Sequence, residues 1–307
     1  MQYLDIPHTN LKVSIITLGT WVFDRDSWGG GDEKDSQAAV QAALDMGITL
    51  IDTAPVYGFG MSEEIVGRAI KGRRDQVLIA TKCGLIWKGR SIRVDLSPAS
   101  IENELDASLK RLGTDVIDIY QCHWPDPNTP IRKTMETLVR LKNKKKIRYI
   151  GVSNFDANLL KKAVEITPVA TIQNQYSMLE RTIEKDVLAV CREQGIGVLA
   201  YGPLAGGILS GKYQMPPDLE KEDARSFFYK YYSGASFEKT KNLLEELKKI
   251  EQPLNQIAIN WVRQQPEVSS VIVGCRNAEQ VRQNVAASDW DLTAEQLDHI
   301  RQLSDGV

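Results

Sequence analysis

Four polar side chains stand where short apolar runs of the sequence end, and each carries a group that can bind or release a proton. Asp52 ends the run TLID, Tyr57 lies in the loop just beyond it, Lys82 ends VLIATK and His123 ends VIDIYQCH. Any one of these residues alone is more often structural than catalytic. Their occurrence after three consecutive apolar runs indicates a shared site for proton transfer.

The chemistry that these groups suit is donation of a proton to an oxygen atom that gains negative charge. A free tyrosine has a pKa of about 10, and a nearby ammonium group would lower it. We expect Lys82 to supply that ammonium, Asp52 to balance its charge and His123 to orient the substrate oxygen. This set fits carbonyl reduction. Acyl transfer is less favoured, because no nucleophile beside a base is visible.

Eight short strands that alternate with helical segments would position these residues. The strands are apolar nearly throughout, as is typical of a sheet that is covered on both faces. We expect them at 15–21, 49–54, 77–82, 116–123, 147–154, 170–177, 197–203 and 269–274. Eight such units in 307 residues predict an α/β (β/α)8 TIM barrel, in which catalytic groups gather at the C-terminal ends of the strands. A doubly wound sheet is the alternative.

Two segments depart from strict alternation of strand and helix. Residues 3–15, YLDIPHTNLKVSI, predict an N-terminal β-hairpin that turns at PHTN and plugs the barrel floor. Residues 202–234 form a long loop after strand 7, and loops of this length are usually functional. Because no repeat or linker is visible, residues 1–307 are predicted to form a single barrel domain.

Composition excludes several classes of protein. The formal net charge of −2 argues against a nucleic-acid or membrane-surface binder, and no apolar stretch reaches the roughly 20 residues that span a bilayer. The four cysteines are scattered, with no spacing that would bind a metal. We therefore expect free thiols, a cytoplasmic location without a signal peptide, and a monomer as the default assembly.

Two glycine-rich segments are near-misses to nucleotide motifs. In GFGMSE, Glu63 occupies the third glycine position of a dinucleotide fingerprint, where close helix–strand packing needs glycine. After Lys212, Tyr213 stands where a P-loop needs Ser or Thr. Neither a Rossmann fingerprint nor a P-loop is therefore predicted.

The segments TLGTW, IDTAPVYGFGMSE, IATK, YQCHWPD, GVSNF and IQNQYS, in this order, resemble the aldo-keto reductase superfamily over essentially the whole chain. The segments GPLAGGILSGKY and GCRNAEQVRQN are similar to its bacterial branch that groups with potassium-channel β subunits. The resemblance implies a barrel that binds NADPH and reduces aldehydes or ketones to alcohols. It also implies a catalytic tetrad of Asp52, Tyr57, Lys82 and His123, with Tyr57 as the general acid.

The resemblance further implies which residues contact the cofactor. Those expected at the nicotinamide are Ser153, Asn154, Gln175 and Tyr201, with Gly19, Thr20 and Trp21 nearby; those at the pyrophosphate are Gly202, Pro203, Leu204, Ala205, Gly206, Lys212 and Arg225; those at the 2′-phosphate and adenine are Gly274, Arg276, Gln280 and Asn284. A cation at a helix start, as at Arg276, is disfavoured unless an anion binds there, which favours NADPH over NADH. Structural alternatives are helix capping by Ser153 and Asn154, and backbone bonding by Gln175.

Three tryptophans, Trp21, Trp87 and Trp124, are predicted to line the substrate pocket. Aromatic walls favour apolar or aromatic carbonyl compounds, and we expect an open site with broad specificity and weak Michaelis constants. One alternative function is a cofactor-bound regulatory module like the channel β subunits, which carry asparagine where this chain has His123. Another is a lyase or aldolase that forms a Schiff base on Lys82.

Overall fold

Eight parallel strands close into a barrel in the computed structural model, which describes residues 1–24, 28, 31–305 and 307. In chain order they are β3 (Ile16–Gly19), β4 (Leu50–Asp52), β5 (Leu78–Cys83), β8 (Ile117–Cys122), β9 (Ile147–Ser153), β10 (Thr171–Gln175), β11 (Gly197–Tyr201) and β12 (Val268–Gly274). β12 pairs with β3 and closes the ring. The predicted barrel is confirmed, and each strand lies within or overlaps its expected range.

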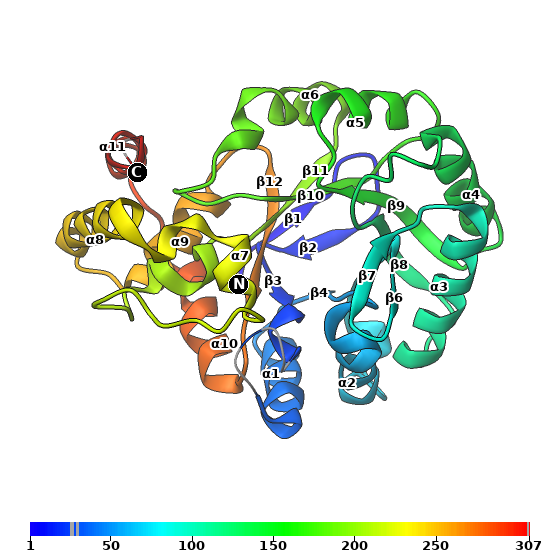
Figure 1. Cartoon of the computed structure of the whole chain (residues 1–307), viewed down its shortest axis with the longest axis horizontal. Helices are drawn as coiled ribbons and strands as arrows, with labels where there is room; N and C mark the ends of the chain where they lie inside the picture. Colours follow the sequence, from blue (N-terminus) through cyan, green and yellow to red (C-terminus); the bar gives the residue numbers. More distant parts are fainter. Residues whose placement is uncertain (25–27, 29–30, 306) are drawn as a thin grey trace.

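Helices surround this barrel (Figure 1). They are α1 (Glu33–Asp45), α2 (Met61–Ala69), α3 (Pro98–Leu112), α4 (Ile131–Asn143), α5 (Ala157–Val164), α6 (Val187–Gln194), α8 (Gly234–Leu247), α9 (Leu254–Arg263), α10 (Ala278–Val285) and α11 (Ala294–Ser304). Local sequence signals set the ends of α3: the Ser97 side chain accepts a hydrogen bond from the backbone of Ser100, and Gly113 ends the helix in a left-handed conformation.

The N-terminal hairpin, β1 (Tyr3–Asp5) and β2 (Lys12–Ser14), closes the bottom of the barrel, as predicted. Ile6, Leu11 and Val13 from this segment are buried against the inward-facing Leu50 and Ile119 of the barrel strands. Because apolar side chains fill this end, the open end of the barrel is the one at which the strands terminate.

Two further segments cover that open end. β6 (Leu85–Lys88) and β7 (Ser91–Val94) form an antiparallel hairpin directly after β5, which the sequence analysis did not predict. The long loop after β11 contains the short helix α7 (Ala224–Phe228), which lies near the middle of the view in Figure 1. Both segments contribute side chains to the cavity described below.

Within the described part of the chain, no helix is long and apolar enough to cross a membrane, and no three His, Cys, Asp or Glu side chains gather as metal ligands do. The four cysteines are free thiols, as expected, and all of them are buried.

Candidate active site

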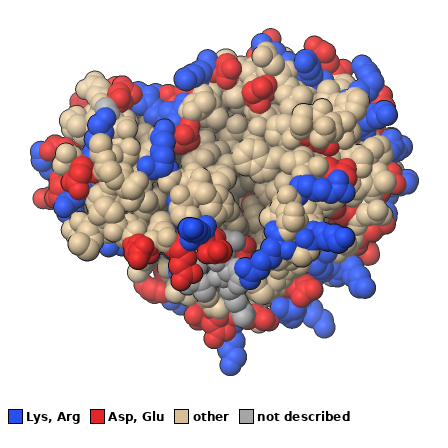
Figure 2. All heavy atoms as spheres, viewed as in Figure 1, with Lys and Arg blue, Asp and Glu red and all other residues tan. Residues whose placement is uncertain are grey.

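A cavity of ≈ 660 Å³ opens where the barrel strands end. Figure 2 shows the hollow near the centre of the face that it displays. Asp52, Tyr57 and His123 line it. Asp52 is the last residue of β4 and lies in register with Gly19 of β3 and Ala80 of β5, which places its carboxylate at the rim.

Lys82 joins these side chains from below. Its ammonium donates to Asp52 Oδ2 at 2.8 Å, to the Thr53 carbonyl at 2.9 Å and to the Tyr57 hydroxyl at 3.1 Å. The Lys82 side chain is fully buried and does not line the cavity. The ring of His123 stands edge-on to that of Tyr57, with the centroids 5.8 Å apart. The four side chains therefore meet at one place, as the sequence predicted.

A strained turn brings Tyr57 to this place. Gly58, Phe59 and Gly60 all have positive φ, of 59°, 52° and 102°. This left-handed run reverses the chain within the short connection between β4 and α2, so that the Tyr57 ring is buried at the barrel mouth. A positive φ is unfavourable for Phe59, because it has a side chain. Backbone strain of this kind is common at functional sites.

Burial decides the protonation states of the site. Desolvation first, and the charge of Asp52 second, raise the pKa of Tyr57 well above its usual 10. The net change is therefore upward, and not the lowering expected from Lys82, because desolvation of the buried hydroxyl dominates. Burial also lowers the pKa of Lys82, against the pull of Asp52. For His123, burial and the Lys82 charge hold the pKa well below 6.5, which keeps its imidazole neutral.

Gln173 is a site residue that the sequence analysis missed. Its side-chain amide donates to Asp52 Oδ1 at 2.7 Å, and it lines the cavity, whereas Gln175 does not. Both residues point to the same face of β10, because side chains alternate along a strand. The two side chains differ in how deep in the barrel they lie. The motif IQNQYS contains both glutamines, so it indicated a glutamine at the site. Spacing in the sequence could not decide between Gln173 and Gln175.

Most of the expected cofactor residues line the same cavity. They are Gly19, Trp21, Ser153, Asn154, Tyr201, Gly202, Pro203, Leu204, Gly206, Lys212, Arg225, Gly274, Arg276, Gln280 and Asn284. Thr20, Gln175 and Ala205 do not line it. The Thr20 hydroxyl donates instead to the Asp52 carbonyl, and Ala205 is completely buried beneath its loop.

The donors along this cavity fit a group that carries phosphates. Lys212, Arg225 and Arg276 all reach it, and the charge of Arg225, after burial, lowers the pKa of Arg276. Arg225 is also paired with Asp223, and two cations close together in a partly buried place suit an anion. Gly206 has φ 73°, and a Cβ atom there would lie 2.9 Å from the Tyr229 ring. The loop thus needs glycine to follow its course beside these cations.

Comparisons with known proteins decide the family. A profile of the Aldo/keto reductase family matches residues 15–305. This chain belongs to the aldo/keto reductase family. It is 42% identical over 301 residues to aldo-keto reductase YhdN of Bacillus subtilis (strain 168), covering 96% of this chain and 91% of that protein. It is 35% identical to the NADH-specific methylglyoxal reductase of Escherichia coli (strain K12), covering 100% and 99%.

The fold comparison agrees. The structure of glycerol dehydrogenase AKR11B4 from Gluconobacter oxydans is similar, with a TM-score of 0.91 at 38% identity, covering 98% of this chain and 94% of that one. As an aldo/keto reductase, the protein is an oxidoreductase that uses a nicotinamide cofactor, NAD(P)H, and acts on carbonyl compounds. The (β/α)8 fold and the enzyme class expected from the sequence are confirmed.

Asn154 connects the catalytic and cofactor sides of this aldo/keto reductase. Its amide donates to the His123 carbonyl at 2.9 Å, and its side-chain oxygen accepts a bond from the Tyr201 hydroxyl at 2.9 Å. The capping alternative for Ser153 and Asn154 is wrong, because the side chain of Asp156 caps α5 through the Leu159 amide. Asn154 adopts φ 59°, so its side chain turns back to the cavity.

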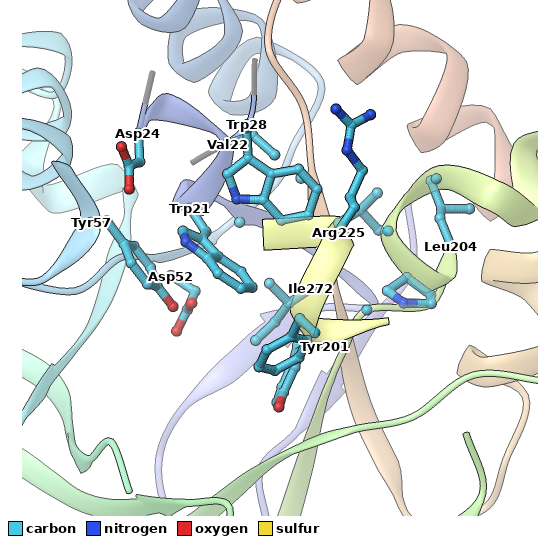
Figure 3. Close-up of a pocket in the computed structure, with 18 of the residues that line it drawn as sticks. Trp21, Val22, Asp24, Trp28, Asp52, Tyr57, Tyr201, Leu204, Arg225 and Ile272 are labelled. Atoms are coloured by element: carbon cyan, nitrogen blue, oxygen red, sulfur yellow. The ribbon is translucent and has the colours of Figure 1, made fainter. Parts of the chain in front are cut away.

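Aromatic side chains form the wall beside the tetrad. Trp21 stacks against Tyr57 with the ring centroids 5.9 Å apart, and Figure 3 shows both beside Asp52, with Arg225 on the other side of the cavity. Trp21 and Trp124 line the cavity as expected. Trp87 does not, and packs instead against Phe59, which does. Among the lining side chains that were not predicted are Trp28, Leu85, Ile92, Phe227 and Phe228.

Proposed function

We propose that this aldo/keto reductase reduces aldehydes and ketones to alcohols with NADPH, and that Tyr57 donates the proton. The observation that carries the proposal is the contact between the Tyr57 hydroxyl and the Lys82 ammonium at 3.1 Å, with Asp52 behind that ammonium. When bound, the nicotinamide supplies the hydride. The tetrad has to supply the proton and to hold the oxygen that receives it.

The protonation states support these roles. The raised pKa of Tyr57 keeps it a phenol, which is the proton-donating form. Once the proton leaves, the phenolate lies beside the Lys82 ammonium, and this ion pair reduces the energy of an otherwise unfavourable buried anion. His123 stays neutral, so that a ring N–H can donate to the substrate oxygen while the other nitrogen carries no charge.

We propose that Ser153, Asn154 and Gln173 hold the nicotinamide end, with Tyr201 against the ring, and that Gln173 replaces Gln175 in this role. Lining of the cavity by Gln173, and not by Gln175, supports the exchange. The glycine-rich loop with Lys212 and Arg225 would hold the pyrophosphate.

Arg276 supports NADPH as the preferred form of the cofactor. It stands just before α10, where a helix start and two guanidinium groups favour the extra phosphate. We further propose that the protein is a cytoplasmic monomer and that its substrate is an apolar carbonyl compound. The buried free thiols support the cytoplasmic location, and the aromatic walls of the cavity support the apolar substrate.

Absorbance assays of NADPH oxidation over a panel of aldehydes and ketones, with NADH in parallel, test the function. Tyr57→Phe should lower kcat by about 10²–10⁴-fold, which is the usual contribution of general acid catalysis. Cofactor affinity, measured by fluorescence titration, should change little. A variant with normal kcat would refute the role of Tyr57.

The two alternatives have weaker support. His123 in the cavity argues against a regulatory module, and measurable turnover would exclude one. A Schiff base on Lys82 would require an accessible amine, but this amine is fully buried and paired with Asp52. Borohydride trapping of a substrate on Lys82 would reverse that conclusion.

A further inference from the structure

Glu104 is a buried carboxylate without a cationic partner in the described residues. It lies on α3, outside the barrel, and is 9% exposed. Its two oxygens accept hydrogen bonds from the Gly84 amide at 2.9 and 3.1 Å, and Oε1 also accepts one from the Ser100 hydroxyl at 3.1 Å. Burying a carboxylate without an ion pair is unfavourable, so its position calls for an explanation.

The group that Glu104 holds is the peptide unit between Cys83 and Gly84. The amide of this unit donates to Glu104, and its carbonyl accepts the backbone N–H of His123 at 2.9 Å. Since a peptide unit is planar, fixing the N–H direction also fixes the carbonyl that positions His123. Lys82 is the next residue back along β5.

The adjoining peptide unit, between Gly84 and Leu85, begins the β6–β7 hairpin. The Gly84 carbonyl accepts the Asp95 amide at 3.0 Å, which closes the hairpin. Gly84 has φ 93°, and a Cβ atom there would lie 2.3 Å from Leu96 Cδ2. The chain can therefore make this bend only with glycine. Leu85 and Ile92 of the hairpin line the cavity.

We propose that Glu104 is a positioning residue, which orients the Cys83–Gly84 peptide and thereby holds His123 and the β6–β7 hairpin in place for carbonyl reduction. This inference rests on the proposed function. Glu104 touches neither substrate nor cofactor and acts through the backbone alone.

The surroundings of Glu104 make this contact sensitive to pH. Burial raises the pKa of Glu104 to about 7, Gly84 and Ser100 oppose that rise, and the charges of Asp95 and Glu63 add to it. Cys83 and Tyr120, the other titratable groups that interact with it, are buried with raised pKa values and stay neutral. Arg111, on the same helix, is paired with Glu63. Protonation of Glu104 near neutral pH would weaken the hydrogen bonds that its carboxylate accepts from the Gly84 amide.

Selective isotope labelling tests the contact between Glu104 and the Gly84 amide without an activity assay. Cys83–Gly84 is the only Cys–Gly pair in the sequence, so carbonyl-¹³C cysteine with ¹⁵N glycine gives a single HNCO correlation. In the wild type this signal should shift with a midpoint near pH 7. The shift should persist in Glu102→Gln, a control at a partly exposed position of the same helix, and vanish in Glu104→Gln. A signal that stays constant in the wild type, or that titrates in Glu104→Gln, would overturn the proposal.

Kinetics test the positioning role. Wild-type kcat/KM should fall about tenfold from pH 8 to pH 6, the loss expected when a charge-assisted bond becomes a neutral one. In Glu104→Gln the same profile should be flat, and Glu102→Gln should follow the wild type. A Glu104→Gln profile that retains the wild-type inflection would refute positioning. If the wild type reduces no carbonyl compound at any pH, the proposed function fails instead, while the NMR signal still reports whether Glu104 holds the peptide.

Discussion

The side-chain amide of Gln173 lies 2.7 Å from the Asp52 carboxylate, on the oxygen that Lys82 leaves free. This contact links the catalytic ion pair to a residue that lines the cavity. Gln173 thus has two neighbours of functional interest, a buried carboxylate and the place where we propose that the nicotinamide binds.

Replacement of Gln173 should therefore affect both catalysis and stability. In Gln173→Leu the second oxygen of Asp52 loses its close donor, and we expect unfolding to become about 1–3 kcal/mol easier, with at least tenfold lower kcat/KM. Urea denaturation and steady-state kinetics measure the two effects. Gln175→Leu is the matched control on the same strand. If it proves the more damaging of the two changes, Gln175 rather than Gln173 holds the cofactor.

Lys82 and Asp52 should be strongly coupled in stability. Both are buried, and their atoms are 2.8 Å apart. Removing one partner leaves an unpaired buried charge, so Lys82→Met or Asp52→Asn alone should lower the free energy of unfolding by about 3–5 kcal/mol. The double variant should lose much less than the sum. A double-mutant cycle by urea denaturation measures this, and simple additivity would show that the pair is not coupled.

The two directions of the reaction should differ in their pH dependence. The pKa of Tyr57 is raised well above 10, so the phenol remains protonated throughout the neutral and mildly alkaline range. Reduction should therefore show no alkaline loss between pH 7 and about pH 9. Alcohol oxidation needs the phenolate and should rise continuously with pH. Initial rates in both directions provide the test, and a fall in the reduction rate centred below pH 9 would contradict the raised pKa.

Arg276 should distinguish the two forms of the cofactor. Arg276→Ala should raise the Kd of NADPH by about 10- to 100-fold, since buried charge-assisted contacts to an anion are strong, and should leave the Kd of NADH nearly unchanged. Arg282→Ala changes an exposed arginine of the adjoining helix that is paired with Glu279, and serves as the control. Equal weakening of both cofactors by Arg276→Ala would place the 2′-phosphate elsewhere.

Glu104 also makes a prediction about stability. Its pKa rises from 4.5 to about 7 on folding, so the folded state binds more protons between these values. The stabilisation is complete below pH 4.5 and is lost as the pH rises through 7, by about 3 kcal/mol for a shift of this size. Glu104→Gln should lack that loss. Urea denaturation of both proteins across pH measures this. As the pH rises, the wild type should lose stability relative to Glu104→Gln, so that the difference between their unfolding free energies narrows or reverses. A difference that stays constant would show that Glu104 does not titrate in this range.

Much of the barrel and the tetrad could be predicted because their signals are local. Apolar runs with polar residues at their ends mark the strands, and parallel strands in a closed barrel bring those ends together. For this reason the sequence alone predicts Asp52, Lys82 and His123 at one rim. The cap of α3 at Ser97 is local in the same way.

Tertiary structure alone decided the features that depend on depth and on distant contacts. The pKa of Tyr57 rises because surrounding side chains remove water from its hydroxyl, and no spacing in the chain reports that burial. Gln173 and Gln175 share one strand face, and only their height in the barrel distinguishes them. Glu104 meets Gly84 across 20 residues, through a backbone amide that every residue type except proline presents. The amino-acid sequence determined which groups reach the barrel mouth, whereas packing determined their charges and what holds them there.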